Sequence, residues 1–319
     1  MLLYTLKRLA FIAVILVVMS VLIFWATQVM PGDVSQMILG QFATDDQVRA
    51  VRARLGLDDP IHVQYLRWAA GILRGDLGMS MMMDRPIGPL IGDAIQRSAV
   101  LAGISIVLVA VVGIWLGVFS AVRKDTAADH AVSVATYFFI SVPEFFWAIV
   151  VILVFAGYLG WFPATGYVPL SDGFGTWLQH LILPVATLVS GLVAHVSRLT
   201  RSSMIETMQS QYVVAARAKG LPERVVIRRH ALRNALVPTI TVLAIDVGLL
   251  MGGIVVVETV FSYPGLGRLL IFAIEQKDIP MVQAGILCVT AVYAVANLAA
   301  DLLYAFFNPR IRYGNAVAS

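Results

Sequence analysis

The sequence has a single cysteine, Cys288, and therefore predicts no disulfide within the chain. It also lacks the H-E-x-x-H, G-x-S-x-G and G-x-x-x-x-G-K-S/T motifs of zinc proteases, serine hydrolases and nucleotide-binding loops. Its five histidines are scattered and do not have the spacing of metal ligands. The sequence thus predicts no enzyme, no cofactor and no metal site in this chain. If the protein moves a solute uphill, the energy has to come from a partner or an ion gradient.

Charged residues are scarce as well. They make up 13% of the 319 residues, hydrophobic residues make up 59%, and the mean hydropathy is +0.85, whereas soluble domains have about 25% charged residues. About 20 apolar residues span a bilayer, and six windows of that kind occur, at residues 9–32, 98–122, 131–171, 173–194, 234–261 and 279–300. The fold class predicted is an all-α membrane protein with six transmembrane helices, the first of which is too long for a signal peptide and is expected to be a retained anchor.

Lysine and arginine residues concentrate on one side of these spans. Lys7 and Arg8, Arg123 and Lys124, the long loop 198–237 and the tail 308–319 carry most of them. Because cytoplasmic loops carry an excess of positive charge, both termini are predicted to be cytoplasmic. The chain then divides into a first helix (1–30), an extracytoplasmic segment (31–97), a five-helix core (98–307) that includes loop 198–237, and the tail (308–319).

The extracytoplasmic segment is predicted to be a small helical insertion rather than a linker. Residues 44–47, Thr-Asp-Asp-Gln, form a capping box for a helix ending near residue 55, and a second helix is expected over 61–74. Four methionines follow, at positions 79, 81, 82 and 83. Soft thioethers can bind copper, but adaptable packing at a channel mouth is the interpretation we favour.

Loop 198–237 is rich in arginine and contains two amphipathic stretches. The first is expected to end at Gly220, a usual helix C-terminal residue, and the second to begin at Pro222, which suits a first helical position. A basic, well-capped helical hairpin between membrane spans predicts a docking surface. From composition alone, a basic loop held near anionic lipid is an equal alternative.

Two acids lie inside the expected spans, Glu144 in the middle of the third and Asp246 about a third of the way through the fifth. Intramembrane acids are costly and usually face protein or water, so both are candidates for the substrate pathway. The alternative for each is a hydrogen bond to a neighbouring helix, or protonation of the carboxylate. Spaced glycines, Gly113 with Gly117 and Gly248 with Gly252, predict close helix packing.

The fifth span is followed by Tyr263, Pro264 and Gly265, where we expect the helix to end and the chain to reverse sharply. A short apolar helix is predicted from Leu266 to about residue 274, and it presents Leu266 and Leu269. Such a re-entrant helix could serve as an outer gate that closes the pathway by dewetting. A plain connecting loop is the alternative.

Several motifs together resemble ATP-binding-cassette importer permeases of the dipeptide/oligopeptide/nickel family. The segment A-A-R-A-K-G at 215–220, followed by R-H-A-L-R-N-A-L at 229–236, resembles their cytoplasmic loop, although Val214 stands where that loop usually has Glu. Further matching segments are P-G-D at 31–33, L-G-L-D-D-P at 55–60, G-D-L-G at 75–78, V-E-T-V-F-S-Y-P-G-L-G-R at 257–268 and N-P-R-I-R at 308–312. The resemblance covers nearly the whole chain and suggests the first of two permease subunits.

This resemblance implies a type I importer fold in a bacterial or archaeal cytoplasmic membrane. It implies a homologous second permease, two cytoplasmic ATPases that bind ATP and Mg²⁺, an extracytoplasmic substrate-binding protein, and a short peptide as cargo. The residues that would couple this chain to the ATPases are Ala215, Ala216, Gly220, Leu221, Pro222, Glu223, Arg224, Arg228, Arg229, His230 and Arg233. A nickel chelate or other small solute is the alternative cargo, and an ion-driven secondary transporter is the alternative class, although no internal repeat supports the latter.

Overall fold

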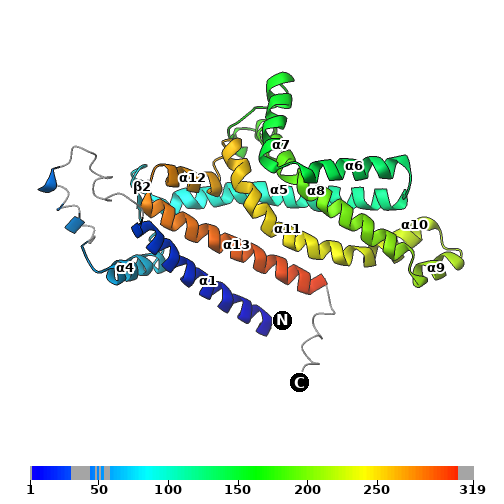
Figure 1. The fold of residues 1–319 in the computed structure, drawn as a ribbon, viewed down its shortest axis with the longest axis horizontal. Helices are drawn as coiled ribbons and strands as arrows, with labels where there is room; N and C mark the ends of the chain where they lie inside the picture. Colours follow the sequence, from blue (N-terminus) through cyan, green and yellow to red (C-terminus); the bar gives the residue numbers. More distant parts are fainter. Residues whose placement is uncertain (1, 30–43, 47–48, 50–51, 54–57, 308–319) are drawn as a thin grey trace. The chain divides into compact units, whose positions relative to one another are not determined.

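The computed structural model describes residues 2–29, 44–46, 49, 52–53 and 58–307 (Figure 1). The predicted helix over 44–55 lies largely outside these residues. The chain divides into two compact units. Unit 1 is built on Arg97–Pro264 and includes Met1 and Val295–Ser319, and unit 2 comprises Leu2–Gln96 and Gly265–Ala294. Two long helices, α5 (Ile87–Val122) and α13 (Ile279–Phe307), each contribute one end to each unit.

Unit 2 contains α1 (Leu2–Val29), α4 (Ile61–Leu73) and α12 (Leu266–Glu275), with the first parts of α5 and α13. The outer helix predicted over 61–74 is therefore confirmed as α4, and it contacts α1 through the Tyr65 hydroxyl, 2.9 Å from Ser20 Oγ. Two very short antiparallel strands, β1 (Met79–Ser80) and β2 (Arg85–Pro86), were not predicted. The unit's buried core consists of Ile87, Ile91, Ala94, Leu266, Ala273, Met281, Val282 and Ala284.

Unit 1 is centred on α8 (Phe174–Met208), a 35-residue helix that contacts α6 (Ala127–Ser141), α7 (Glu144–Val151) and α11 (Leu232–Val260). The predicted close packing at Gly113 and Gly117 on α5 is confirmed, because a Cβ at either position would collide with α8, at Val196 or at the Ser197 carbonyl. The second glycine pair differs from its prediction, since a Cβ at Gly252 would meet no atom within 4 Å. The close approach on α11 lies one residue later, at Gly253.

The third predicted span is broken rather than straight. Helix α6 ends at Ser141, α7 begins at Glu144, and α7 continues as the π-helical segment η1 (Ile152–Tyr158), with a bend of 106° at the break. A residue before proline is pushed out of the helical region, and Val142 is accordingly extended, with φ −101° and ψ 127°. Glu144 thus lies at the break, in the first turn of a new helix, and not inside one continuous helix, which corrects the prediction.

The second helix of the basic loop was predicted to be a short, separate element, and the structure differs from this prediction. Helix α9 (Gln211–Ala218) ends before Gly220, and a helical stretch begins at Glu223, one residue after Pro222. That stretch runs through α10 (Glu223–Val225) and the π-helical η3 (Val226–Ala231) directly into α11. Because no break separates them, the segment after Pro222 and the fifth membrane span form one helix of 38 residues.

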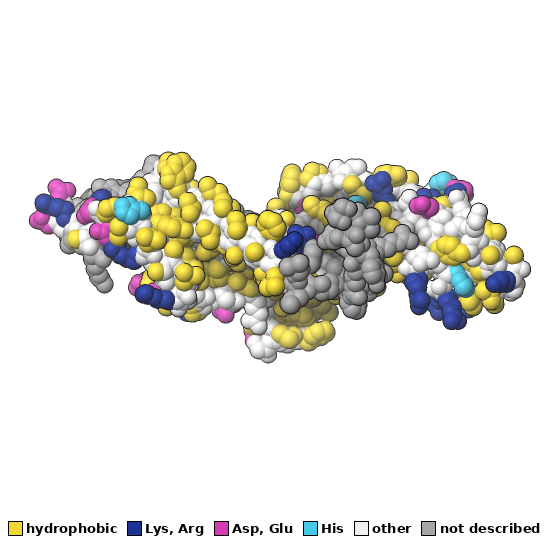
Figure 2. Space-filling model, turned by 90° about the horizontal axis from the view of Figure 1, so that it is seen from below, with side chains coloured by type: hydrophobic (Ala, Val, Ile, Leu, Met, Phe, Trp, Pro, Cys, Tyr) yellow, Lys and Arg dark blue, Asp and Glu magenta, His cyan; other side chains and the backbone are white. Residues whose placement is uncertain are grey.

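Five helices are long and apolar enough to cross a membrane, and the bent pair α6 and α7–η1 makes six if it counts as one span. The all-α fold with six spans is therefore confirmed, with a broken third span. Hydrophobic side chains cover much of the visible face in Figure 2, as expected for helices that face lipid. Many hydrophobic side chains of the described residues are more than half exposed, among them Phe11, Trp25, Val111, Trp115 and Leu153.

Candidate functional site

The basic hairpin of unit 1, residues 211–237, is held by a small apolar core. Val213 and Ala216 from α9 are buried against Val226 and Ala231 of η3, together with Met204 of α8. The connection between the two arms turns at Gly220, whose φ is +74°, so the left-handed helix stop predicted from the sequence is confirmed. The hairpin is therefore anchored to the membrane helices α8 and α11 from which its arms emerge.

An ion pair closes the turn of this hairpin. Arg217 of α9 donates two hydrogen bonds to the Glu223 carboxylate across Gly220, at 2.6 Å from Nη2 and 3.1 Å from Nε. Its Nη1 also donates to the Met208 carbonyl at 3.3 Å, and the bond to Glu223 raises the pKa of Arg217 above its usual value. Both side chains are partly exposed, so the pair fixes geometry more than it adds stability.

The outer surface of the hairpin is rich in basic side chains. Its exposed members among the predicted coupling residues are Ala215, Gly220, Leu221, Pro222, Glu223, Arg224, Arg228, Arg229 and Arg233, whereas His230 is half-buried and Ala216 is buried. Within the part of the chain that the structure describes, Arg224, Arg228 and Arg229 form no ion pair. Figure 2 shows lysine and arginine side chains at the right-hand end, where Figure 1 places α9 and α10. The surface is thus available to acidic groups of another molecule.

A second charged feature of unit 1 was not predicted from the sequence. Asp129 on α6 is fully buried, and its carboxylate accepts hydrogen bonds from Arg201 Nε at 2.6 Å and Arg201 Nη2 at 2.7 Å. Ser120 Oγ on α5 and the Asp125 amide donate to the same carboxylate. One sequence signal could have drawn attention to Asp129, because Thr126 lies three residues before it, at the spacing of a capping box. In the structure Thr126 is the N-cap of α6.

The two predicted pathway acids have different surroundings. Asp246 on α11 is 1% exposed, and its Oδ1 lies 3.1 Å from Nδ1 of His195 on α8. The alternative considered for Asp246, a hydrogen bond to a neighbouring helix, is thus present, and sequence reasoning did not identify His195 as the partner. The Asp246 Oδ2 atom is buried and has no hydrogen-bond partner among the residues that the structure describes.

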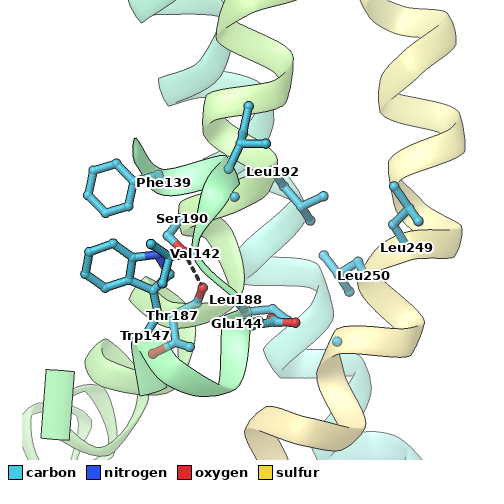
Figure 3. A pocket seen from close by; sticks show the side chains of 13 residues that line it. Phe139, Val142, Glu144, Trp147, Thr187, Leu188, Ser190, Leu192, Leu249 and Leu250 are labelled. Carbon is cyan, nitrogen blue, oxygen red and sulfur yellow. Dashed lines mark hydrogen bonds between the residues drawn. The ribbon is translucent and has the colours of Figure 1, made fainter. Parts of the chain in front are cut away.

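Glu144 lines a cavity of about 180 Å³ in unit 1. The walls come from the α6–α7 break, from α8 and from α11 (Figure 3), and they include Phe139, Trp147, Thr187, Ser190, Leu249 and Gly253. In Figure 3 the Glu144 carboxylate points toward α11, which carries Leu249 and Leu250. The two predicted pathway acids thus lie in separate environments, Asp246 on α11 beside His195 of α8 and Glu144 in the cavity facing α11.

The five predicted gate residues are divided between the units. In unit 1, Tyr263 is buried, its ring lies 5.4 Å from that of Tyr167, and its hydroxyl donates to the Arg97 carbonyl at 3.1 Å. Burial raises the pKa of Tyr263. Pro264 also belongs to unit 1, while Gly265, Leu266 and Leu269 belong to unit 2.

The short helix predicted from Leu266 is confirmed as α12, but the reversal before it uses another residue. Gly265 is extended, with φ −92° and ψ −176°, and serves as the N-cap of α12. The left-handed position is Ser262, with φ 53°. The Tyr263 amide then donates to the Glu258 carbonyl at 2.9 Å, which satisfies an end carbonyl of α11.

A bundle of long apolar helices that presents a basic helical hairpin is the architecture of a multi-pass membrane protein. The chain belongs to the family of binding-protein-dependent transport system inner membrane components, which it matches over residues 113–313. Residues 1–105 match the N-terminal component of the same kind of membrane protein. The chain is therefore a permease subunit of ATP-binding-cassette type, a transport component rather than an enzyme.

Relatives match over nearly their whole length. A probable peptide ABC transporter permease of Sinorhizobium fredii is 36% identical, with 97% of this chain and 99% of the relative covered. A putative peptide transport system permease of Brucella abortus is 38% identical, with 97% and 98% covered. A glutathione transport system permease of Escherichia coli is 37% identical, with 98% and 100% covered. A solved structure of an amino acid ABC transporter is 18% identical in sequence, with a TM-score of 0.47. The match covers 70% of this chain and 94% of the transporter's chain.

Proposed function

We propose that this chain is a permease subunit of a peptide importer, and that it forms the path for short peptides together with a homologous second permease. Two cytoplasmic ATPases that bind ATP and Mg²⁺ would drive it, and an extracytoplasmic binding protein would deliver the peptide. The names of the relatives, two peptide permeases and one glutathione permease, support this cargo class. Glutathione is itself a small peptide, so one chemical class accounts for all three names.

The observation that carries the coupling role is the basic hairpin, residues 211–237. Its turn is fixed by Gly220 and by the Arg217–Glu223 pair, and its arginines are exposed. The continuity of Glu223–Val260 as one helix means that movement of the hairpin is movement of the fifth span. A rigid connection of this kind transmits the closure of an ATPase dimer to the membrane helices. Val214, exposed on α9, leaves this loop without the carboxylate that related loops carry at that position.

The remaining assignments follow from this role. The chain would lie in the cytoplasmic membrane of a bacterium or archaeon with the hairpin and both termini in the cytoplasm, because the lysines and arginines gather there. Glu144 and Asp246 would meet the cargo in the membrane. Tyr263, Pro264, Gly265, Leu266 and Leu269 would form the outer gate.

The test is reconstitution of the chain with its second permease, ATPases and binding protein. Proteoliposomes are loaded with ATP, and uptake of a labelled tripeptide is measured with and without the binding protein. We expect uptake that requires both ATP and the binding protein. Uptake of a nickel chelate instead of peptide would replace the cargo assignment. Peptide uptake by the chain alone, driven by an ion gradient, would replace the importer assignment with a secondary transporter.

A further inference from the structure

Each fully buried acid among the described residues of unit 1 has a side-chain partner. Asp129 is bonded to Arg201, Asp246 to His195, and Glu258 to Ser98 Oγ. Glu144 is half-buried and differs from them, because its carboxylate has no hydrogen bond or ion pair with any residue in the described part of the chain. A carboxylate inside a membrane protein is expensive unless a cation or several donors accompany it. A cation supplied from outside this chain would therefore complement Glu144.

The walls around Glu144 suit a small organic cation. Trp147 and Phe139 form an aromatic pair with ring centroids 4.8 Å apart, and both line the cavity (Figure 3). Aromatic faces attract ammonium groups. The hydroxyl oxygens of Thr187 and Ser190 donate their own protons to backbone carbonyls, so they are left to act as acceptors toward a ligand. A carboxylate, an aromatic wall and hydroxyl acceptors together recognise an N–H-rich cation.

A further group indicates what is attached to that cation. The Trp147 indole N–H is buried and has no acceptor among the residues that the structure describes. An unsatisfied buried donor costs about 1–3 kcal/mol, so a complete site would supply an acceptor oxygen near it. The amino end of a peptide has both features, an ammonium group and a carbonyl oxygen one carbon away from it.

We propose that the cavity is a subsite for the amino-terminal residue of the peptide cargo, with Glu144 as the counter-ion of the α-ammonium group. This inference rests on the proposed function as a peptide permease and adds the part of the peptide that the permease itself recognises. Pockets for drug-sized ligands measure about 300–1,000 Å³, whereas this one measures about 180 Å³. It therefore accommodates only the amino-terminal end of a peptide, and every peptide with a free amino terminus has this end. The cavity does not discriminate among the remaining side chains of the peptide.

The position of the carboxylate depends on one glycine. A Cβ at Gly253 would collide with both carboxylate oxygens of Glu144, whereas a Cβ at the adjacent Gly252 would meet nothing within 4 Å. Replacing Gly253 with alanine therefore displaces the carboxylate and keeps its charge. Gly252→Ala is a matched control, because it makes the same chemical change one residue away on the same helix.

The test measures protection of a cysteine in the cavity wall. Cys288 is replaced by alanine, and Leu249, which lines the cavity and is 59% exposed, is replaced by cysteine. The assembled permease–ATPase complex in lipid nanodiscs is then treated with a thiol reagent in the presence of glycinamide, Ala-Ala-Ala or their N-acetylated forms. Glycinamide has the ammonium and the carbonyl without the rest of a peptide. A cysteine at Val134, 68% exposed on α6 and outside the cavity lining, is the reference site.

We expect both free-amine compounds to protect the cysteine at position 249 from the thiol reagent. The concentration that gives half-protection should be at least tenfold higher for the acetylated forms. Glu144→Gln and Gly253→Ala should each raise the half-protecting concentration of the free amines about tenfold, the scale of one charge-assisted hydrogen bond. Gly252→Ala, and Asp172→Asn in the exposed loop 159–173, should leave it unchanged. The cysteine at position 134 should not be protected by any of the four compounds.

Equal protection by acetylated and free amines, no protection at all, or protection that survives Glu144→Gln would overturn the ammonium subsite. Any of these results could coexist with ATP-driven peptide uptake by the wild-type complex, in which case the proposed function stands. Protection by glycinamide in a complex that takes up no peptide would instead keep the ammonium site and overturn the peptide cargo. Retention of the ATPases by each variant is checked first by size-exclusion chromatography, and Gly253→Ala supplies the result if Glu144→Gln fails to assemble.

Discussion

Arg201 binds both carboxylate oxygens of Asp129, through Nε at 2.6 Å and Nη2 at 2.7 Å. The two residues lie 72 positions apart, on α8 and α6, and Ser120 Oγ adds a bond from α5. One buried carboxylate thus joins three helices of unit 1 near the ends of α5 and α6. These helices pack closely because Gly113 and Gly117 bring α5 against α8.

The first prediction concerns this ion pair. Asp129→Asn should destabilise the permease by about 3 kcal/mol, because the Arg201 guanidinium, whose side chain is 30% exposed, would lose its counter-ion. The thermal unfolding midpoint of the detergent-solubilised complex should fall by several degrees. Glu206→Gln, an exposed change on α8, is the control and should leave the midpoint unchanged. An unaltered midpoint in Asp129→Asn would mean that the pair contributes geometry without stability.

Asp129 also illustrates what the sequence could predict. The six apolar windows were sufficient to predict the number and order of the spans, because a bilayer requires each span to be long and apolar. The identity of charge partners was not predictable, since Asp129 and Arg201 are brought together only by the packing of α6 on α8. The same holds for His195 and Asp246, which are 51 residues apart on α8 and α11. Spacing along one helix carries no signal for such pairs.

The second prediction concerns the turn of the hairpin. Gly220→Val should strain the backbone by roughly 1–2 kcal/mol, because a β-branched residue disfavours the left-handed conformation at φ +74°. A Cβ at this position meets nothing within 4 Å, so the effect is conformational and not a collision. The complex should lose ATPase subunits or hydrolyse ATP without uptake, measured as ATP consumed per peptide transported. Gly220→Asn is the control, since asparagine tolerates this conformation. Full coupling in the valine variant would contradict the assignment.

The third prediction concerns the basic face of the hairpin. The double variant Arg228→Glu/Arg229→Glu should weaken retention of the ATPases, because two exposed positive charges facing an acidic partner would become repulsive. Retention of wild-type complex should also fall as salt concentration rises. Lys124→Glu, an exposed change in the loop between α5 and α6, serves as the control. If the double variant co-purifies with its ATPases as well as the control does, these arginines face lipid or solvent instead.

The fourth prediction concerns the buried pair on α8 and α11. Asp246→Asn should slow peptide uptake several-fold and leave basal ATP hydrolysis largely intact, because the acid lies away from the ATPase-coupling hairpin. His195→Gln should reduce uptake to a similar extent, and the double variant should be no slower than either single variant, because the two side chains act as one unit. Unchanged uptake of several peptides in Asp246→Asn would leave this pair with a packing role alone.

The third span shows why the position of Glu144 could not be predicted. The apolar window 131–171 has the composition of one long helix, and a single proline inside a membrane helix is often tolerated. Here Val142 and Pro143 are both extended, so the helix ends and restarts at Glu144. Whether a proline bends or breaks a span depends on whether the neighbouring helices can pack against the chain in its new direction. In this chain, α8 and α11 both contact α7.

The last prediction concerns the outer gate. Helix α12 is present as predicted, and Leu269 packs against the core of unit 2 with Leu266 and Ala273. A cysteine at position 269, in a variant that lacks Cys288, should react slowly with an external thiol reagent in the resting complex. It should react several-fold faster when ATP and loaded binding protein are present, because opening of the pathway would hydrate this face of α12.

A cysteine at Leu73, which is 88% exposed on α4, should react at the same rate in both states and so corrects for general changes in access. The variant must first retain ATP-driven peptide uptake, so that both states are functional. An equal rate at position 269 in the two states would show that this face of α12 remains dry throughout transport. The five predicted gate residues would then be parts of a fixed connection between α11 and α13, and the closure of the pathway would have to be sought among the membrane spans themselves.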